Sequence, residues 1–197
     1  MNLKALRYSL WGLVVLAVAM FALFAMRQPE PAVQQDSKIV IGGAFAMTSH
    51  LGQPVTEQDY LGQPIAMFFG FTNCPDICPT TLLRMTDLMK KLGPDADKLQ
   101  VVLVSVDPER DTPEILKSYL EQFDSRFSAM TGTPAQLAAF AKGYRFAYKK
   151  VLLDGVNYTM DHSAGVYLYD AKGAFVGTLD PHESADIALE KLRRLMP

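Results

Sequence analysis

Apolar positions recur with two different periods along this chain, and these periods predict its helices and strands. Two short runs, 64–71 and 99–106, are almost entirely apolar, which is typical of strands buried in a sheet. A helix is predicted between them, because apolar residues recur there at helical spacing: Leu82, Met85, Leu88, Met89 and Leu92. Gly93 and Pro94 are a fitting end for this helix. A strand, a helix and a second strand in this order predict a βαβ unit with parallel strands.

The later part of the chain continues this alternation. Thr112 is a suitable N-cap for a helix that opens with Pro113, and Thr133 precedes another helix that opens with Pro134. The other expected elements, in chain order, are a short strand at 128–131, β structure within 144–153, a hairpin over 165–179 and a last helix over about 183–195. The whole order predicts an α/β domain with a central mixed sheet and helices on both faces.

The first part of the chain has a different character. Residues 10–26 form an apolar run without a charged side chain, which as a helix measures about 25 Å and approaches the thickness of a bilayer's hydrocarbon core. The run is longer than the apolar core of a cleaved signal peptide, so an uncleaved transmembrane helix is the favoured prediction. Lys4 and Arg7 precede the run, which predicts a cytoplasmic N-terminus with the rest of the chain across the membrane.

These features divide the chain into three segments. Residues 1–26 are the predicted membrane anchor, the polar residues 27–38 with two prolines are a tether, and 39–197 form the folded domain. The N-terminal extension is too short for a transit peptide in addition to an anchor. We therefore expect a bacterial inner membrane, with the domain in the oxidising periplasm.

Charge excludes one class of function. The chain has 19 Lys and Arg against 21 Asp and Glu, and its sequence contains no run of basic residues. A surface that follows a phosphate backbone needs clustered positive charge. Nucleic-acid binding is therefore not expected.

Chemistry is concentrated in the stretch FTNCPDICPTTL, which contains the only two cysteines of the chain, Cys74 and Cys78. A proline follows each cysteine, and Pro79 is expected to be the first residue of the helix, with Cys78 as its N-cap. Both sulfurs would then lie near the positive end of the helix dipole, which predicts lowered thiol pKa values. The stretch also follows a predicted central strand, at the sheet edge where α/β proteins bind ligands.

Three interpretations of this cysteine pair remain to be weighed. A structural disulfide would close a very short loop and stabilise the fold little. A redox pair is compatible with the spacing, although it differs from the C-x-x-C of thioredoxin-type exchange. The third interpretation is a metal site, in which two soft thiolates and one imidazole suit Cu(I) and leave Zn(II) one ligand short.

A histidine is needed for the metal site, and the chain has three: His50, His162 and His182. His162 stands just before a predicted strand, with Asp161 next to it as a possible orienting carboxylate. His50 lies in a turn and His182 near a helix start, so both have ordinary structural roles available. Spacing alone does not choose among the three.

With these residues in view, the chain resembles the SCO/SenC family of membrane-anchored copper proteins. Three stretches carry the resemblance, with a weaker match in IGGAFAMTSHLGQPVT: FFGFTNCPDICPTTL resembles the family's C-P-x-x-C-P loop, VSVDPERDTPEIL its V-D-P-x-R-D-T-P segment, and DHSAGVYLYDAKG its D-H-S motif with the following hairpin. The match covers about residues 39–196. It implies a thioredoxin-like fold in which Cys74, Cys78 and His162 bind copper, as Cu(I) or Cu(II).

The resemblance also implies a function and partners. The expected function is a copper chaperone that assembles the binuclear copper centre of cytochrome c oxidase subunit II. The expected partners are subunit II or its assembly factors, other copper chaperones, and the membrane through residues 10–26. The charged stretch 107–112 is expected at the same sheet edge as the cysteines, either as a plain helix entry or as part of a rim for docking a partner.

Two other functions stay open at this point. A thiol–disulfide reductase could use Cys74 and Cys78 to keep the client's cysteines reduced for metal loading. A peroxiredoxin-like peroxidase ranks last, because Thr72-Asn73-Cys74 is only a faint match to a peroxidatic T-x-x-C site and Met67 stands where that motif has its upstream proline. His162 separates the first two hypotheses, because disulfide exchange does not need it.

Overall fold

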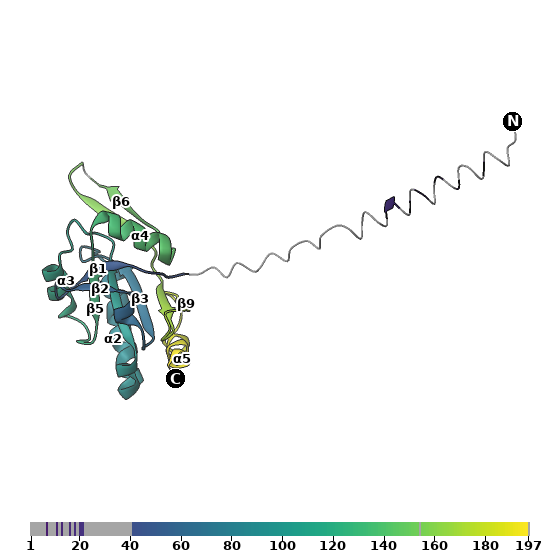
Figure 1. Ribbon diagram of the computed structural model, residues 1–197. Coiled ribbons are helices and arrows are strands. Elements are labelled where there is room, and N and C mark those ends of the chain that lie inside the picture. Colours follow the sequence, from purple (N-terminus) through teal and green to yellow (C-terminus); the bar gives the residue numbers. More distant parts are fainter. Residues whose placement is uncertain are drawn as a thin grey trace. The chain divides into compact units, whose positions relative to one another are not determined.

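The computed structural model describes residues 41–153 and 155–196, with a few isolated positions between 7 and 21 (Figure 1). The chain divides into two units, Met1–Ile39 and Val40–Pro197, and the description below concerns the second. The predicted anchor and tether fall largely outside the described residues. Over the part of the chain that is described, no helix has both the length and the apolar character needed to cross a membrane. The anchor therefore stays a prediction.

A seven-stranded mixed sheet forms the centre of the domain, with the strand order β2-β1-β5-β4-β3-β8-β9. The strands are β1 (Ala46–Ser49), β2 (Pro54–Thr56), β3 (Ile65–Gly70), β4 (Gln100–Ser105), β5 (Ser128–Thr131), β8 (Val166–Tyr169) and β9 (Phe175–Leu179). The neighbours β3, β4 and β5 are parallel, and every other pair in the sheet is antiparallel. The predicted parallel pair and the predicted hairpin are confirmed.

Helices cover this sheet on both faces. They are α2 (Ile77–Leu92), α3 (Pro113–Leu120), α4 (Pro134–Tyr144) and α5 (Ala185–Leu195), with two 3-10 helices, η1 (Glu57–Tyr60) and η2 (Gly93–Lys98). Every residue of β3 is buried, although alternate side chains of a strand point to opposite faces, so both faces must be covered. Thr112 caps α3 as predicted, and Thr133 caps the predicted helix α4, each accepting a hydrogen bond from a backbone N–H of the first turn.

A separate antiparallel ribbon stands apart from the main sheet. It consists of β6 (Tyr148–Leu152) and β7 (Tyr158–His162), in a register that pairs Tyr148 with His162. Figure 1 shows β6 at one end of the domain, near α4. His162 precedes β8, as the sequence predicted, and it is also the last residue of β7, a strand that the sequence did not predict.

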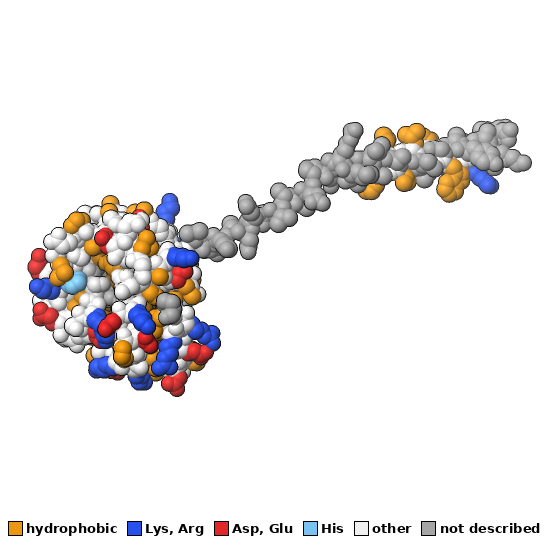
Figure 2. All heavy atoms as spheres, turned by 60° about the horizontal axis from the view of Figure 1, so that its bottom comes forward, with side chains coloured by type: hydrophobic (Ala, Val, Ile, Leu, Met, Phe, Trp, Pro, Cys, Tyr) orange, Lys and Arg blue, Asp and Glu red, His pale blue; other side chains and the backbone are white. Residues whose placement is uncertain are grey.

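Charge on the domain surface is mixed in sign. Figure 2 shows acidic and basic side chains interspersed on the face in view. Such a distribution gives that face no strong field of one sign.

Candidate copper site

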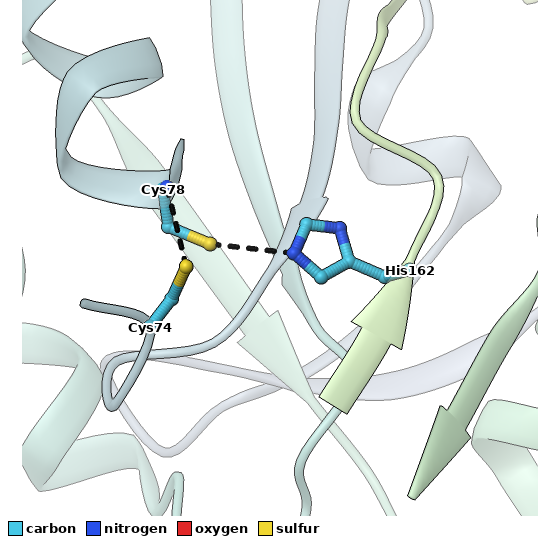
Figure 3. A group of neighbouring side chains, drawn as sticks. All are labelled: Cys74, Cys78 and His162. Atoms are coloured by element: carbon cyan, nitrogen blue, oxygen red, sulfur yellow. Dashed lines mark hydrogen bonds between the residues drawn. The ribbon is translucent and has the colours of Figure 1, made fainter. Parts of the chain in front are cut away.

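The sulfur atoms of both cysteines lie at the start of α2, beside the end of β7 (Figure 3). Cys74 is in the loop after β3, and Cys78 is the second residue of α2. The predicted N-cap position of Cys78 is wrong, because the helix begins at Ile77 and its N-cap is Asp76. The first-turn N–H groups of a helix have no acceptor within it, so Pro79 fits at the third position as well as at the first.

The Cys74 sulfur takes part in the start of this helix. The backbone N–H of Cys78 donates a hydrogen bond to Cys74 Sγ at 3.4 Å. Asp76, the N-cap residue, accepts no such bond with its side chain. The turn that places Cys74 next to Cys78 is therefore held by the sulfur itself.

His162 completes the group from the other side. Its Nε2 lies 3.5 Å from Cys78 Sγ, and the ligand atoms of Cys74, Cys78 and His162 all lie within 4.8 Å of one another. His162 Nδ1 lies 3.0 Å from the Ser163 carbonyl oxygen. A carbonyl oxygen only accepts, so Nδ1 carries the proton and the Nε2 lone pair faces the sulfur atoms.

The orienting partner of His162 differs from the expected one. Asp161 is exposed, and His162 Nδ1 donates its hydrogen bond to the Ser163 carbonyl oxygen instead. Successive side chains of a strand point to opposite faces, so Asp161 and His162 cannot both face the cysteines. A backbone carbonyl serves as well as a carboxylate to fix the tautomer of a ligating histidine.

Burial is the largest influence on the pKa of the Cys78 thiol. Its side chain is fully buried, and Cys74 is only 8% exposed. Burial raises the pKa of the Cys78 thiol, an effect larger than the lowering by a backbone hydrogen bond near Phe71. The predicted lowering of this pKa at the helix N-terminus is therefore wrong for Cys78. A bound metal cation reverses the balance, because a coordinating thiol loses its proton.

Gly70 makes room for the Cys78 sulfur. A Cβ atom at position 70 would lie 2.9 Å from Cys78 Sγ and 2.7 Å from a ring carbon of Phe68. Both approaches are shorter than real Cβ contacts, so only glycine fits without moving the sulfur or the ring. Sequence reasoning did not single out this residue, since a glycine at the end of a strand has no chemical signature of its own.

Asp111 anchors the cysteine loop from the connection between β4 and α3. Its carboxylate accepts hydrogen bonds from the Thr72 backbone N–H at 3.1 Å, the Thr72 hydroxyl at 2.6 Å and the Ser105 hydroxyl at 2.6 Å. Asp111 is completely buried and Asp107 is 1% exposed. The expected docking rim is thus wrong for these two carboxylates, which are both buried, and Asp111 holds the cysteine loop through Thr72.

The two other histidines lie elsewhere. His50 is tied to β5, because its Nδ1 accepts the Ala129 backbone N–H at 3.2 Å. His182 is exposed in the connection before α5. Over the described residues, a single group of possible metal ligands is found, formed by Cys74, Cys78 and His162. Two sulfurs and one imidazole nitrogen form a soft, three-membered donor set that suits Cu(I).

Comparisons with known proteins place the chain in a family. A family model described as SCO1/SenC matches residues 33–197. The chain is 37% identical over 155 residues to the mitochondrial Protein SCO2 homolog of Mus musculus, covering 77% of this chain and 61% of that protein. It is 34% identical over 165 residues to an SCO2-like protein of Rickettsia felis, covering 80% of each. The chain spans 61% and 52% of the length of the mouse and yeast SCO2 proteins it matches.

Solved structures agree with this placement. ScoI of Bradyrhizobium japonicum with copper bound superposes with a TM-score of 0.74 at 41% identity, covering 79% of this chain and 99% of that one. Yeast Sco1 with copper bound gives a TM-score of 0.72 at 32% identity, covering 79% and 87%. The expected thioredoxin-like fold is confirmed for the α/β domain. The chain therefore belongs to the SCO1/SenC family.

Proposed function

We propose that this protein is a copper chaperone that binds one copper ion through Cys74, Cys78 and His162. It would deliver the ion to the binuclear copper centre of cytochrome c oxidase subunit II. The observation that carries the proposal is the convergence of two buried sulfurs and Nε2 of His162, whose atoms all lie within 4.8 Å of one another. Support comes from two family members whose structures hold copper.

The two sulfurs and one imidazole nitrogen suit a copper ion that is to be passed to a client. Two thiolates and an imidazole leave a copper ion three-coordinate, so a further ligand from a client has room to bind before the first ligands leave. A groove of about 310 Å³ adjoins His162 and is lined by residues 147–149 and 161–163. Since Cys78 is fully buried and His162 is half-buried, the histidine side is where a client's ligand would approach.

We also propose that the domain works at a bacterial inner membrane, anchored by residues 10–26 and facing the periplasm. The apolar run and the preceding positive charges support this placement. A tether of 27–38 would confine the domain near a membrane-bound client and raise its effective concentration there.

The alternative function is thiol–disulfide reduction of the client. The two thiols are free, and their sulfur atoms lie within 4.8 Å of each other, so they are the pair that would form a disulfide. However, the attacking species in disulfide exchange is a thiolate, and burial raises the pKa of Cys78. The structure thus gives the copper site more support than the reductase.

A competition titration with a Cu(I) chelator tests the proposal on the reduced full-length protein. We expect one Cu(I) per chain, and a loss of at least about tenfold in affinity for His162→Ala, because one of three ligands is removed. His182→Ala is the matched control, since its side chain is exposed and does not belong to the group of possible metal ligands. It should bind like the wild type.

The same variants separate the two functions. If His162→Ala binds Cu(I) as tightly as the wild type, the three-ligand site is wrong. In the reductase case, the client's disulfide would become a dithiol while Cys74 and Cys78 become a disulfide, and His162→Ala would retain this activity. Copper transfer that requires His162 supports the chaperone.

A further inference from the structure

His162 belongs to a ribbon that is not part of the main sheet, so its position must be fixed by other contacts. β6 and β7 pair only with each other, whereas both cysteines follow β3 in the centre of the seven-stranded sheet. The distance between Cys78 Sγ and His162 Nε2 therefore depends on how the ribbon is attached. One polar attachment lies at the opposite end of β7, at Tyr158, in addition to the packing of Met160 into the core and of the His162 ring against Phe68 and Phe71.

We propose that Asp107 and Arg110 grip Tyr158 and thereby position His162 for copper binding. We call these three residues the Tyr158 clamp. The inference rests on the proposed function, in which His162 is a copper ligand. None of the three residues is a ligand itself, so each is a positioning residue.

Arg110 holds the backbone and the ring of Tyr158. Its Nη1 donates a hydrogen bond to the Tyr158 carbonyl oxygen at 3.1 Å. Its guanidinium carbon lies 3.8 Å from the centroid of the Tyr158 ring, a cation–π contact. One arginine thus fixes both where the strand begins and how its first side chain is turned.

Asp107 holds Arg110 and the hydroxyl end of Tyr158. Its carboxylate pairs with Arg110 Nε and accepts a hydrogen bond from the Tyr158 hydroxyl at 2.8 Å. Asp107 is buried at 1% exposure, and hydrogen bonds to a charged acceptor removed from water are stronger than exposed ones. The three side chains therefore form a closed network.

The strand β7 connects the Tyr158 clamp to the copper ligand His162. Tyr158 is its first residue and His162 its last. Residues four apart in a strand lie on the same face, at a separation of about 13 Å, and the pairing with β6 stiffens the strand between them. A change in the clamp is thus expected to move the imidazole more than the sulfurs.

The cysteine loop is held by the same short segment. Asp111 binds Thr72, two positions before Cys74, and lies four positions after Asp107. The connection between β4 and α3 therefore fixes both halves of the copper site while supplying no ligand. Lys150 and Glu109 add an ion pair at 2.5 Å between the ribbon and this connection, but both are exposed, so its contribution is small.

A double-mutant cycle on the full-length protein tests the clamp, with Cu(I) affinity from chelator competition as the first readout. Arg110→Met removes the hydrogen bonds and the cation–π contact while keeping the length of the side chain. We expect a loss of about tenfold in affinity in the wild-type background. In the His162→Ala background, Arg110→Met should cause no further loss, because the residue acts through His162.

Two further variants support the cycle. Arg126→Met is the matched control, since Arg126 also forms ion pairs, with Asp97 and Asp124, but precedes β5 at the other end of the strands. It should leave the affinity unchanged. Tyr158→Phe removes only the hydroxyl bond to Asp107 and carries the test if Arg110→Met does not fold. Tyr158→Phe should give a smaller loss of Cu(I) affinity than Arg110→Met, and no loss in the His162→Ala background.

The Cu(II) form provides a spectroscopic readout. Nitrogen hyperfine coupling from His162 should weaken in Arg110→Met and return in part in Arg110→Lys, which restores the charge. The clamp is overturned, and the copper site left intact, if Arg110→Met lowers the Cu(I) affinity equally in the wild-type and His162→Ala backgrounds. The same follows if Arg110→Met binds Cu(I) as tightly as Arg126→Met. If His162→Ala alone binds like the wild type, the proposed three-ligand site fails and the clamp falls with it.

Discussion

Asp111 shows how one buried carboxylate is tolerated near the candidate copper site. Three donors, two on Thr72 and one on Ser105, point at its oxygens. They offset only part of the cost of burial, which raises the pKa of Asp111 above its ordinary value of 3.8. Burial of this carboxylate lowers the stability of the fold, and its hydrogen bonds to Thr72 hold the cysteine loop in place.

This environment predicts a specific pH dependence. The folded protein keeps the Asp111 proton at a pH where the unfolded chain has lost it, so stability falls as the pH rises from 3.8 through the folded pKa. Asp111→Asn should abolish this component, because the amide is neutral and can satisfy the Thr72 and Ser105 groups after the hydroxyls rotate. Urea unfolding of both proteins at several pH values measures the difference.

Asp111→Ala is the contrasting variant. It leaves buried donors without an acceptor, at about 1–3 kcal/mol for each. We expect it to be clearly less stable than Asp111→Asn at pH 7. If both variants lose the same stability, the hydrogen bonds to Thr72 and Ser105 are not what holds the loop.

At the scale of elements, local sequence signals defined α4 well. Thr133 accepts the Gln136 N–H at 3.2 Å while Gln136 Oε1 accepts the Thr133 N–H at 2.8 Å, a capping box. Thr133→Ala should lower the free energy of unfolding by about 1 kcal/mol, since the side-chain acceptor is lost. Thr133→Ser keeps the hydroxyl and should differ little, which thermal unfolding of both variants will check. An alanine variant as stable as the serine variant would contradict the capping role.

Elements were predictable where the hydrophobic pattern was long. The runs that became β3 and β4 are buried on both faces, so they stand out as apolar. Three short strands, β1, β2 and β7, were missed because none of them is a continuous apolar run and each includes an exposed position. Their pairing depends on partners distant in sequence, which a local pattern does not contain.

The candidate site was predictable in unequal parts. Cys74 and Cys78 are identified by a local stretch of sequence, whereas His162 lies 84 positions from Cys78 and was chosen only through family resemblance. The raised pKa of Cys78 and the contacts of Asp107 with Tyr158 were not predictable. Both depend on burial and on neighbours that the tertiary structure brings together.

At the scale of the whole molecule, the proposed anchor has a direct consequence. The full-length protein should stay in the membrane fraction after an alkaline wash, because 17 apolar residues can span the hydrocarbon core. A version beginning at residue 39 should be released. Protease added to spheroplasts should digest the domain if it faces the periplasm. Full release of the intact chain by the wash would contradict the anchor.

The central claim is that a single copper ion is held by two sulfurs and one nitrogen. X-ray absorption spectroscopy at the copper edge of the Cu(I)-loaded protein tests it most directly. The account predicts a three-coordinate ion with two sulfur scatterers and one imidazole nitrogen, and loss of the nitrogen in His162→Ala. A spectrum with sulfur scatterers alone, or one that His162→Ala leaves unchanged, would contradict it.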